Sequence, residues 1–158
     1  MKIKDEKTNV MRILEQKKVK YKSYNYLETG AISGMEVAKA LNEDPNLTFK
    51  TLVTIGKTNN HYVFLVPVNK ELDLKKASKA VNEKNIEMVK SKELLALTGY
   101  IHGGCSPVGM KKSFKTVIDN AAKNYDKLIF SGGKIGYQVE TTLDELKKVI
   151  DFDLKDIT

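Results

Sequence analysis

The sequence predicts an α+β domain in which helices surround a mixed, curled sheet, and two observations support this prediction. Extended runs are more numerous than strict strand–helix alternation would need, and segments of helical periodicity are interspersed among them. Apolar positions recur from Val10 to Phe152 without an internal repeat or a linker rich in Pro, Gly or Ser. We therefore expect residues 1–158 to form one domain, a length that can bury a core without disulfides or metals.

The first elements follow from apolar spacing. Val10, Ile13 and Leu14 fall three and four residues apart, which predicts a helix over 7–16. Aromatic and polar residues alternate over 21–29, as in a half-buried strand.

A hairpin is the clearest signal in the chain. Extended runs over 49–56 and 61–68 flank Asn59 and Asn60, which tolerate positive φ. Before it, a short helix is expected over 33–42, with these side chains inward: Met35, Val37, Ala38 and Leu41.

Caps and short apolar runs predict the remaining elements. Up to residue 99 these are a helix from Asp73 to about 81, a strand over 86–90 and a helix over 92–99 capped by Ser91. Beyond it they are a helix over 117–125 capped by Thr116, strands over 127–130 and 137–141 around a turn, and a helix over 143–150 with Thr142 and Glu145 at capping-box spacing.

The charge balance is basic, with 27 Lys+Arg against 20 Asp+Glu and a net charge of +7. Such a surface suits a polyanionic partner, although lysine richness can equally reflect residue bias and solubility. Arg12 is the single arginine, and reading guanine in a duplex groove favours arginine. We therefore expect no sequence-specific DNA binding.

The cysteine content and the apolar runs suggest where the protein works. Cys105 is the one cysteine, so no internal disulfide can form, and a reducing, cytoplasmic setting is expected. The first eighteen residues contain no apolar signal region, and no apolar run is long enough to span a bilayer. We expect a soluble protein with no membrane partner.

The loop over 102–112 is the first candidate site. Its glycines and the Ser–Pro pair can turn backbone N–H groups toward an anionic or carbonyl oxygen, and two lysines would add positive charge at the rim. The candidate binding residues are Gly103, Gly104, Ser106, Pro107 and Gly109, with Lys111 and Lys112 at the rim.

Cys105 has three interpretations. It could be a nucleophile activated by His102, or it could join His102 and His61 in a metal site that would also need carboxylates. The sequence favours the third, a small residue that fits a tight loop. No metal site is expected.

Two further places complete the candidate site. The turn over 131–136 again combines a hydroxyl, glycines and a lysine, which suggests a pocket shared with the first loop. Lys50 stands in the predicted hairpin on the same face as Leu52, where a partly enclosed lysine would hold an anionic partner. The candidate residues in the turn are Ser131, Gly132, Gly133 and Lys134.

Four stretches together resemble the YbaK family of aminoacyl-tRNA deacylases. They are NLTFKTLVT, VPVNKELDLKKASKA, GYIHGGCSPVGMKK and IFSGGKIGYQVE, and the resemblance runs from about Val10 to Ile150. It implies a barrel-like sheet with surrounding helices, and removal of cysteine from mischarged tRNA(Pro) and, less specifically, from tRNA(Cys). The ester cleavage would be of hydrolase or lyase type.

The resemblance also assigns roles to particular residues. The family's essential lysine matches Lys50 and is followed by its threonine at Thr51; the loop glycine matches Gly103 and the serine matches Ser131. The early tyrosine matches Tyr26, with Tyr21 and Tyr24 close by. The reactive thiol would be that of the substrate, so Cys105 would be a bystander and no cofactor would be needed.

The expected partners are aminoacylated tRNA and prolyl-tRNA synthetase. Two alternatives stay open: a deacylase of the same superfamily that acts on Ala-tRNA(Pro), and a lysine-rich RNA-binding module without turnover.

Overall fold

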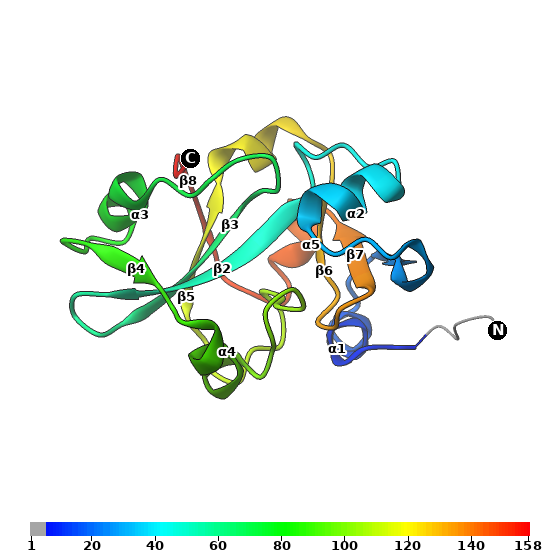
Figure 1. Cartoon of the computed structure of the whole chain (residues 1–158), viewed down its shortest axis with the longest axis horizontal. Helices are drawn as coiled ribbons and strands as arrows, with labels where there is room; N and C mark the ends of the chain where they lie inside the picture. Colours follow the sequence, from blue (N-terminus) through cyan, green and yellow to red (C-terminus); the bar gives the residue numbers. More distant parts are fainter. Residues whose placement is uncertain (1–5) are drawn as a thin grey trace.

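The computed structural model describes residues 6–158 and shows a mixed α+β fold with one five-stranded and one three-stranded sheet (Figure 1). Residues 9–16 and the smaller sheet lie at one end of the molecule, and the C-terminal residues lie on the side of the larger sheet. Among the described residues, no helix combines the length and the apolar character needed to cross a membrane.

The predicted hairpin forms the centre of the larger sheet. β2 (Phe49–Gly56) and β3 (His61–Pro67) pair antiparallel over seven residue pairs, and Asn59 has a φ of +72° in the turn. β4 (Ile86–Met88) pairs antiparallel with the end of β2. The hairpin and the strand that follows it are therefore confirmed.

The helix predicted to follow Thr116 is wrong. Lys115–Asp119 form β5, which pairs parallel with β3, and Asn120–Asn124 form a short 3-10 helix, η2. Residues 116–118 are β-branched and buried, so packing beside β3 outweighs the local helical pattern. The Asp119 side chain, rather than that of Thr116, caps η2.

The remaining strands complete both sheets. β8 (Asp153–Lys155), which the sequence did not predict, pairs parallel with β5, so the larger sheet has the order β4–β2–β3–β5–β8. The smaller sheet is antiparallel and has the order β1–β7–β6. Its strands are β1 (Lys22–Asn25), β6 (Leu128–Ser131) and β7 (Tyr137–Thr141).

The barrel-like closure implied by the resemblance is not observed. Both sheets stay open in the described part of the chain, and they meet where Thr48 bridges to Ile129 and the Ile129 N–H donates to the Leu47 carbonyl at 2.9 Å. One chain segment thus enters the larger sheet beside an edge of the smaller one.

In the described part of the chain, five α-helices and one further 3-10 helix surround the sheets. They are α1 (Asn9–Gln16), η1 (Leu27–Thr29), α2 (Gly34–Ala40), α3 (Leu74–Ala80), α4 (Ser91–Thr98) and α5 (Leu143–Leu146). The side chains of Thr8, Ser33, Asp73 and Thr142 cap four of them. The helices predicted in these regions are confirmed, with shifts at their ends.

Three details of the predicted helices and strands are corrected. Ser91 lies inside α4, whose N-cap is Lys90 without a side-chain bond. α5 ends at Leu146 instead of continuing to 150, and the strand expected over 21–29 is interrupted by η1. Met35 is 46% exposed rather than inward, because α2 covers an open cavity at this point.

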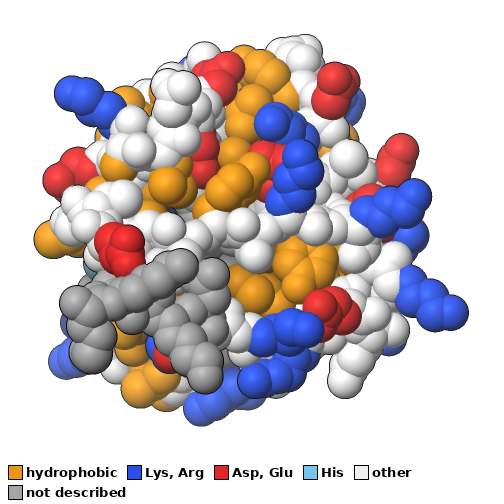
Figure 2. Space-filling model, turned by 90° about the vertical axis from the view of Figure 1, so that its right-hand side faces the viewer, with side chains coloured by type: hydrophobic (Ala, Val, Ile, Leu, Met, Phe, Trp, Pro, Cys, Tyr) orange, Lys and Arg blue, Asp and Glu red, His pale blue; other side chains and the backbone are white. Residues whose placement is uncertain are grey.

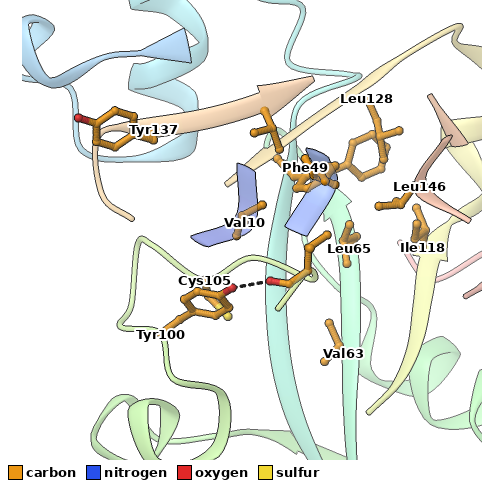
Figure 3. Close-up of a cluster of buried hydrophobic side chains, with 14 of the residues drawn as sticks. Val10, Phe49, Val63, Leu65, Tyr100, Cys105, Ile118, Leu128, Tyr137 and Leu146 are labelled. Carbon is orange, nitrogen blue, oxygen red and sulfur yellow. Dashed lines mark hydrogen bonds between the residues drawn. The ribbon is translucent and has the colours of Figure 1, made fainter. Parts of the chain in front are cut away.

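The core has two layers because both faces of β3 are buried. Val63 and Leu65 face the cluster between the sheets, together with Phe49 of β2 (Figure 3). Phe64 and Val66 face the opposite cluster, beneath α3 and the C-terminal residues. Successive side chains of β3 point to opposite faces of the sheet, and both faces are buried. The sequence of β3 is therefore a continuous apolar run.

We predict that Asp119→Ala lowers the free energy of unfolding by about 2–3 kcal/mol, because it leaves buried donors without an acceptor. Asp119 is buried and accepts from the Ile157 and Ala121 N–H groups at 3.1 and 3.2 Å, which holds the C-terminal residues against β5. Asp144→Ala is the control, since that side chain is 95% exposed. Urea denaturation measures both, and equal effects would contradict the prediction.

Candidate functional site

A cavity of about 410 Å³ lies where the two sheets, α2 and α4 meet. We call it the central cavity. Its lining comes from β2, β4, β6 and β7, from both helices and from the loop that follows α4. Five of the predicted site residues line it: Tyr26, Lys50, Thr51, Gly103 and Ser131. These segments are far apart in the sequence, so the fold brings the five residues together.

Lys50 reaches the cavity from the first half of β2. Its side chain is 29% exposed, and its Nζ lies 3.5 Å from a carboxylate oxygen of Glu71, whose own side chain is 93% exposed. An ion pair at this distance with a solvated partner contributes little. The ammonium is therefore partly enclosed, and its weak bond to Glu71 leaves it available to an anion.

Thr51 and Tyr26 add two hydroxyl groups to the lining. The Thr51 Oγ1 is buried, and among the described residues it has no hydrogen-bond partner. Tyr26 is buried, whereas Tyr24 donates to Glu140 at 2.8 Å and Tyr21 to Glu15 at 3.3 Å, both outside the cavity lining. Of these three tyrosines, Tyr26 alone lines the central cavity.

The glycine loop contributes less than expected. Gly103 lines the cavity with a φ of +87°, a conformation that favours glycine. The Gly104 N–H, however, donates to the Ile101 carbonyl at 3.0 Å, so this amide is already satisfied by a turn. A pair of free amides at Gly103 and Gly104 is therefore not present.

The rest of this loop is built for packing. Ser106 is fully buried, and its Oγ accepts from the Val108 N–H. A Cβ on Gly109 would lie 2.8 Å from the Tyr100 hydroxyl and 2.9 Å from the Ile13 side chain. Pro107 also lies outside the central cavity. These three predicted binding residues are not brought to the site, because they hold the loop against α1 and the core.

In the turn after β6, too, one predicted residue lines the cavity while the glycines serve packing. Ser131 lines the cavity, and its Oγ accepts from the Gly133 N–H at 3.1 Å. A Cβ on Gly132 would lie 3.1 Å from Tyr137, and one on Gly133 would lie 2.5 Å from Val10. Both glycines are needed for close packing and do not line the cavity.

The predicted lysines do not form a rim around the central cavity. Lys134 forms an ion pair with Glu6 at 2.6 Å. Lys111 packs its stem beside Gly99, and Lys112 lines a different groove. Among residues 6–158, Lys50 is the one lysine that lines the central cavity.

The position of Cys105 does not suit a nucleophile. The residue lines the cavity but is 7% exposed, and it lies beside the Tyr100 ring (Figure 3). Burial raises the pKa of its thiol to about 12, although a hydrogen bond involving Thr98 lowers it. The thiol is therefore protonated at neutral pH, whereas nucleophilic cysteines need a lowered pKa.

Sequence reasoning missed two features of the cavity. Its mouth carries three exposed apolar side chains, those of Ile32, Met35 and Met88. Gln138 lines it from β7 although the residue is 7% exposed. A polar residue between two apolar ones in YQVET was the available signal, but alternation alone would place it toward solvent.

A half-buried carboxylate, that of Glu43, holds Gln138 in place. With the amide nitrogen of Gln138 facing Glu43, it donates to both carboxylate oxygens, at 2.7 and 3.1 Å. Glu140 lies nearby and accepts from Tyr24 at 2.8 Å and from Lys127 at 3.3 Å. Burial raises the pKa of Glu43 to about 7, the bond from Gln138 lowers it, and the charge of Glu140 raises it further.

The described residues contain no group of three or more His, Cys, Asp or Glu side chains that could hold a metal ion. The described lining of the cavity thus offers the Lys50 ammonium, the His102 imidazole, several hydroxyl groups and an amide. Such a set can bind an anionic or ester-bearing ligand and stabilise negative charge on oxygen.

Comparison with known proteins gives the chain a family. Residues 31–149 match the family model of the aminoacyl-tRNA editing domain. A protein of Enterococcus faecalis provisionally named Cys-tRNA(Pro)/Cys-tRNA(Cys) deacylase EbsC is 43% identical over 154 residues, covering 97% of this chain and 94% of that protein. The match thus extends over nearly the whole of both chains.

Solved structures share the fold. One of them is provisionally described as a trans-editing enzyme for prolyl-tRNA synthetase. Its TM-score is 0.81 at 25% sequence identity, and the match covers 96% of this chain and 98% of the other chain. The hypothetical protein APE2540 has a TM-score of 0.82 at 19% identity, covering 92% of this chain and 98% of its own. The second likeness concerns the fold alone.

We predict that Glu43→Gln makes stability less dependent on pH. The pKa of Glu43 is about 7 in the folded protein, above the ordinary value of 4.5. Between pH 4.5 and pH 7 the folded protein therefore holds a proton on Glu43 that the unfolded chain has lost. The contribution of Glu43 is therefore fully present below about pH 4.5 and lost as the pH rises through 7.

Thermal denaturation at pH 5 and pH 8 measures this effect. We compare the melting temperature of the variant with that of the natural protein at each pH. The difference, variant minus natural protein, should be larger at pH 8 than at pH 5. Glu28→Gln, on an exposed residue of η1, is the control. Parallel pH profiles for the natural protein and Glu43→Gln would contradict the prediction.

Proposed function

The chain belongs to the aminoacyl-tRNA editing family, and from this premise we propose that it is a trans-editing deacylase that removes cysteine from mischarged Cys-tRNA(Pro) and, less specifically, from Cys-tRNA(Cys). The observation that carries the proposal is the convergence of Tyr26, Lys50, Thr51, Gly103 and Ser131 on the central cavity. The name of the 43% identical relative supports the choice of substrate.

The proposed reaction uses the thiol of the substrate. The cysteinyl sulfur attacks the carbonyl carbon of its own ester, the bond to the ribose oxygen breaks, and a four-membered thiolactone leaves. The thiol proton passes to the ribose oxygen, so no oxidant, reductant or cofactor is consumed. Holding the reacting groups in register can lower the barrier of such an intramolecular step by about 7–11 kcal/mol.

Lys50 would act on the charge that develops in this step. As the sulfur attacks, negative charge develops on the ester oxygens. An ammonium group fixed beside these oxygens stabilises the charged transition state more than it stabilises the neutral ester. The 3.5 Å bond to exposed Glu71 is weak enough to exchange for the substrate. The unpaired Thr51 hydroxyl, on the next residue of β2, lines the same cavity and offers a second donor.

The cavity lining carries few groups that could activate water. No carboxylate lines it in the described part of the chain, and Cys105 is held protonated by burial. The Glu43 carboxylate is engaged by Gln138. His102 also lines the cavity, and its imidazole is a side chain that could act as a general base on water for an ester without a nucleophile of its own, such as that of alanine.

Recognition of the tRNA body requires more surface than the cavity offers. Lysines are scattered among apolar and acidic side chains on the face shown in Figure 2. Scattered cations give salt-dependent capture with little sequence preference. We therefore propose that tRNA identity comes from a partner, prolyl-tRNA synthetase, which the name of a structural relative mentions.

We predict that Lys50→Ala lowers kcat/KM for Cys-tRNA(Pro) about a hundredfold or more, the effect of losing one donor to a developing oxyanion. Cys105→Ala should retain activity, since its thiol is buried and protonated. Release of labelled cysteine measures both variants, with folding checked by thermal denaturation. An inactive but folded Cys105→Ala variant would show that the enzyme's own thiol takes part.

A panel of charged tRNA(Pro) tests the substrate. Cys-tRNA(Pro) should be cleaved far faster than Ala-tRNA(Pro) or Pro-tRNA(Pro), because only cysteine carries the attacking thiol. Faster release of alanine would select the alanyl-specific alternative. Salt-dependent tRNA binding with every ester cleaved at the background rate would select the RNA-binding module.

A further inference from the structure

A second hollow of about 610 Å³ lies between the end of the glycine loop and the segment that leads into β8. It is lined by parts of 107–116 and 147–153, and we call it the basic groove. None of its lining residues belongs to the central cavity.

The groove is rich in lysine. Lys112, Lys115, Lys147 and Lys148 line it against Asp151 and Asp153. Among residues 6–158, Lys112 and Lys115 form no ion pair with a carboxylate, whereas the other two lysines pair with exposed or half-buried acids one helical turn away. Two cations are thus left for an external anion.

Apolar and aromatic side chains also line the groove. Phe114 and Phe152 are half-buried at the edge of the core, beside Met110 and Ile150. The Phe114 ring is held by His61, with ring centres 5.5 Å apart. A groove lined by both cationic and aromatic side chains is the arrangement that holds a nucleic-acid strand through phosphate contacts and stacking.

One loop forms a wall of both hollows. Cys105 lines the central cavity and Pro107 lines the basic groove. Two residues of extended chain span at most about 7 Å, so these lining residues of the two hollows lie within that distance of each other. A strand whose end lies in the central cavity could continue over this wall into the groove.

We propose that the basic groove binds the sugar–phosphate backbone of the tRNA acceptor arm while the aminoacylated nucleotide occupies the central cavity. The identity of the polyanion rests on the proposed function; the groove itself rests on the lysines and rings described above. A small phosphate ligand fits less well, because these lysines are spread along the hollow and no arginine is present to bind it bidentately.

The test uses uncharged tRNA(Pro), so it does not depend on turnover. Lys112→Gln combined with Lys115→Gln should weaken binding about tenfold at low salt and reduce the slope of log K against log salt by about two. The matched control combines Lys79→Gln with Lys84→Gln, two exposed lysines near α3 that line neither hollow. Thermal denaturation establishes that both variants fold.

The outcomes separate this inference from the proposed function. Weaker binding by the groove variant alone supports the groove, even if the natural protein deacylates no substrate. Equal losses in both variants would show diffuse capture by the whole surface and would overturn the proposal. So would a groove variant that binds tRNA(Pro) as tightly as the natural protein.

Discussion

The burial of β3 on both faces is the constraint on which the rest of the structure depends. Val63 and Leu65 pack between the sheets while Phe64 and Val66 pack under α3, so the strand cannot slide without exposing one set. Its antiparallel partner β2 is thereby held in one register. Lys50 and Thr51 are part of that strand, so the rigidity of the core positions the cation and the hydroxyl at the cavity.

The glycine-rich loops serve this arrangement mainly through close packing. Gly109, Gly132 and Gly133 allow the chain to approach α1, Tyr137 and Tyr100, where any side chain would collide. Gly103 is the glycine of its loop that faces the central cavity. A loop whose sequence resembles an anion-binding motif thus serves mainly to pack against the core. The tight packing of its other residues fixes the positions of the few atoms that face the cavity.

The charged groups of the central cavity and of the basic groove are arranged in a way that suits an ester attached to a polyanion. The central cavity carries Lys50 and no carboxylate in its described lining, and the partly protonated Glu43 is held behind Gln138. The basic groove lies on the other side of the loop that carries Cys105. In this arrangement the chemistry of the ester and the capture of the phosphate backbone use different surfaces, which can be altered independently.

The sequence by itself determined what local pattern encodes: the β2–β3 hairpin, the capped helices, the basic surface and the motifs around Lys50, Gly103 and Ser131. The tertiary structure decided the rest. β5 pairs with β3 about fifty residues away, and no local periodicity reports a parallel pairing over that distance. The place of Gln138 in the cavity, the raised pKa of Glu43 and the grouping of the groove lysines likewise arise from contacts between segments remote in sequence, because burial and charge proximity are properties of the packed chain.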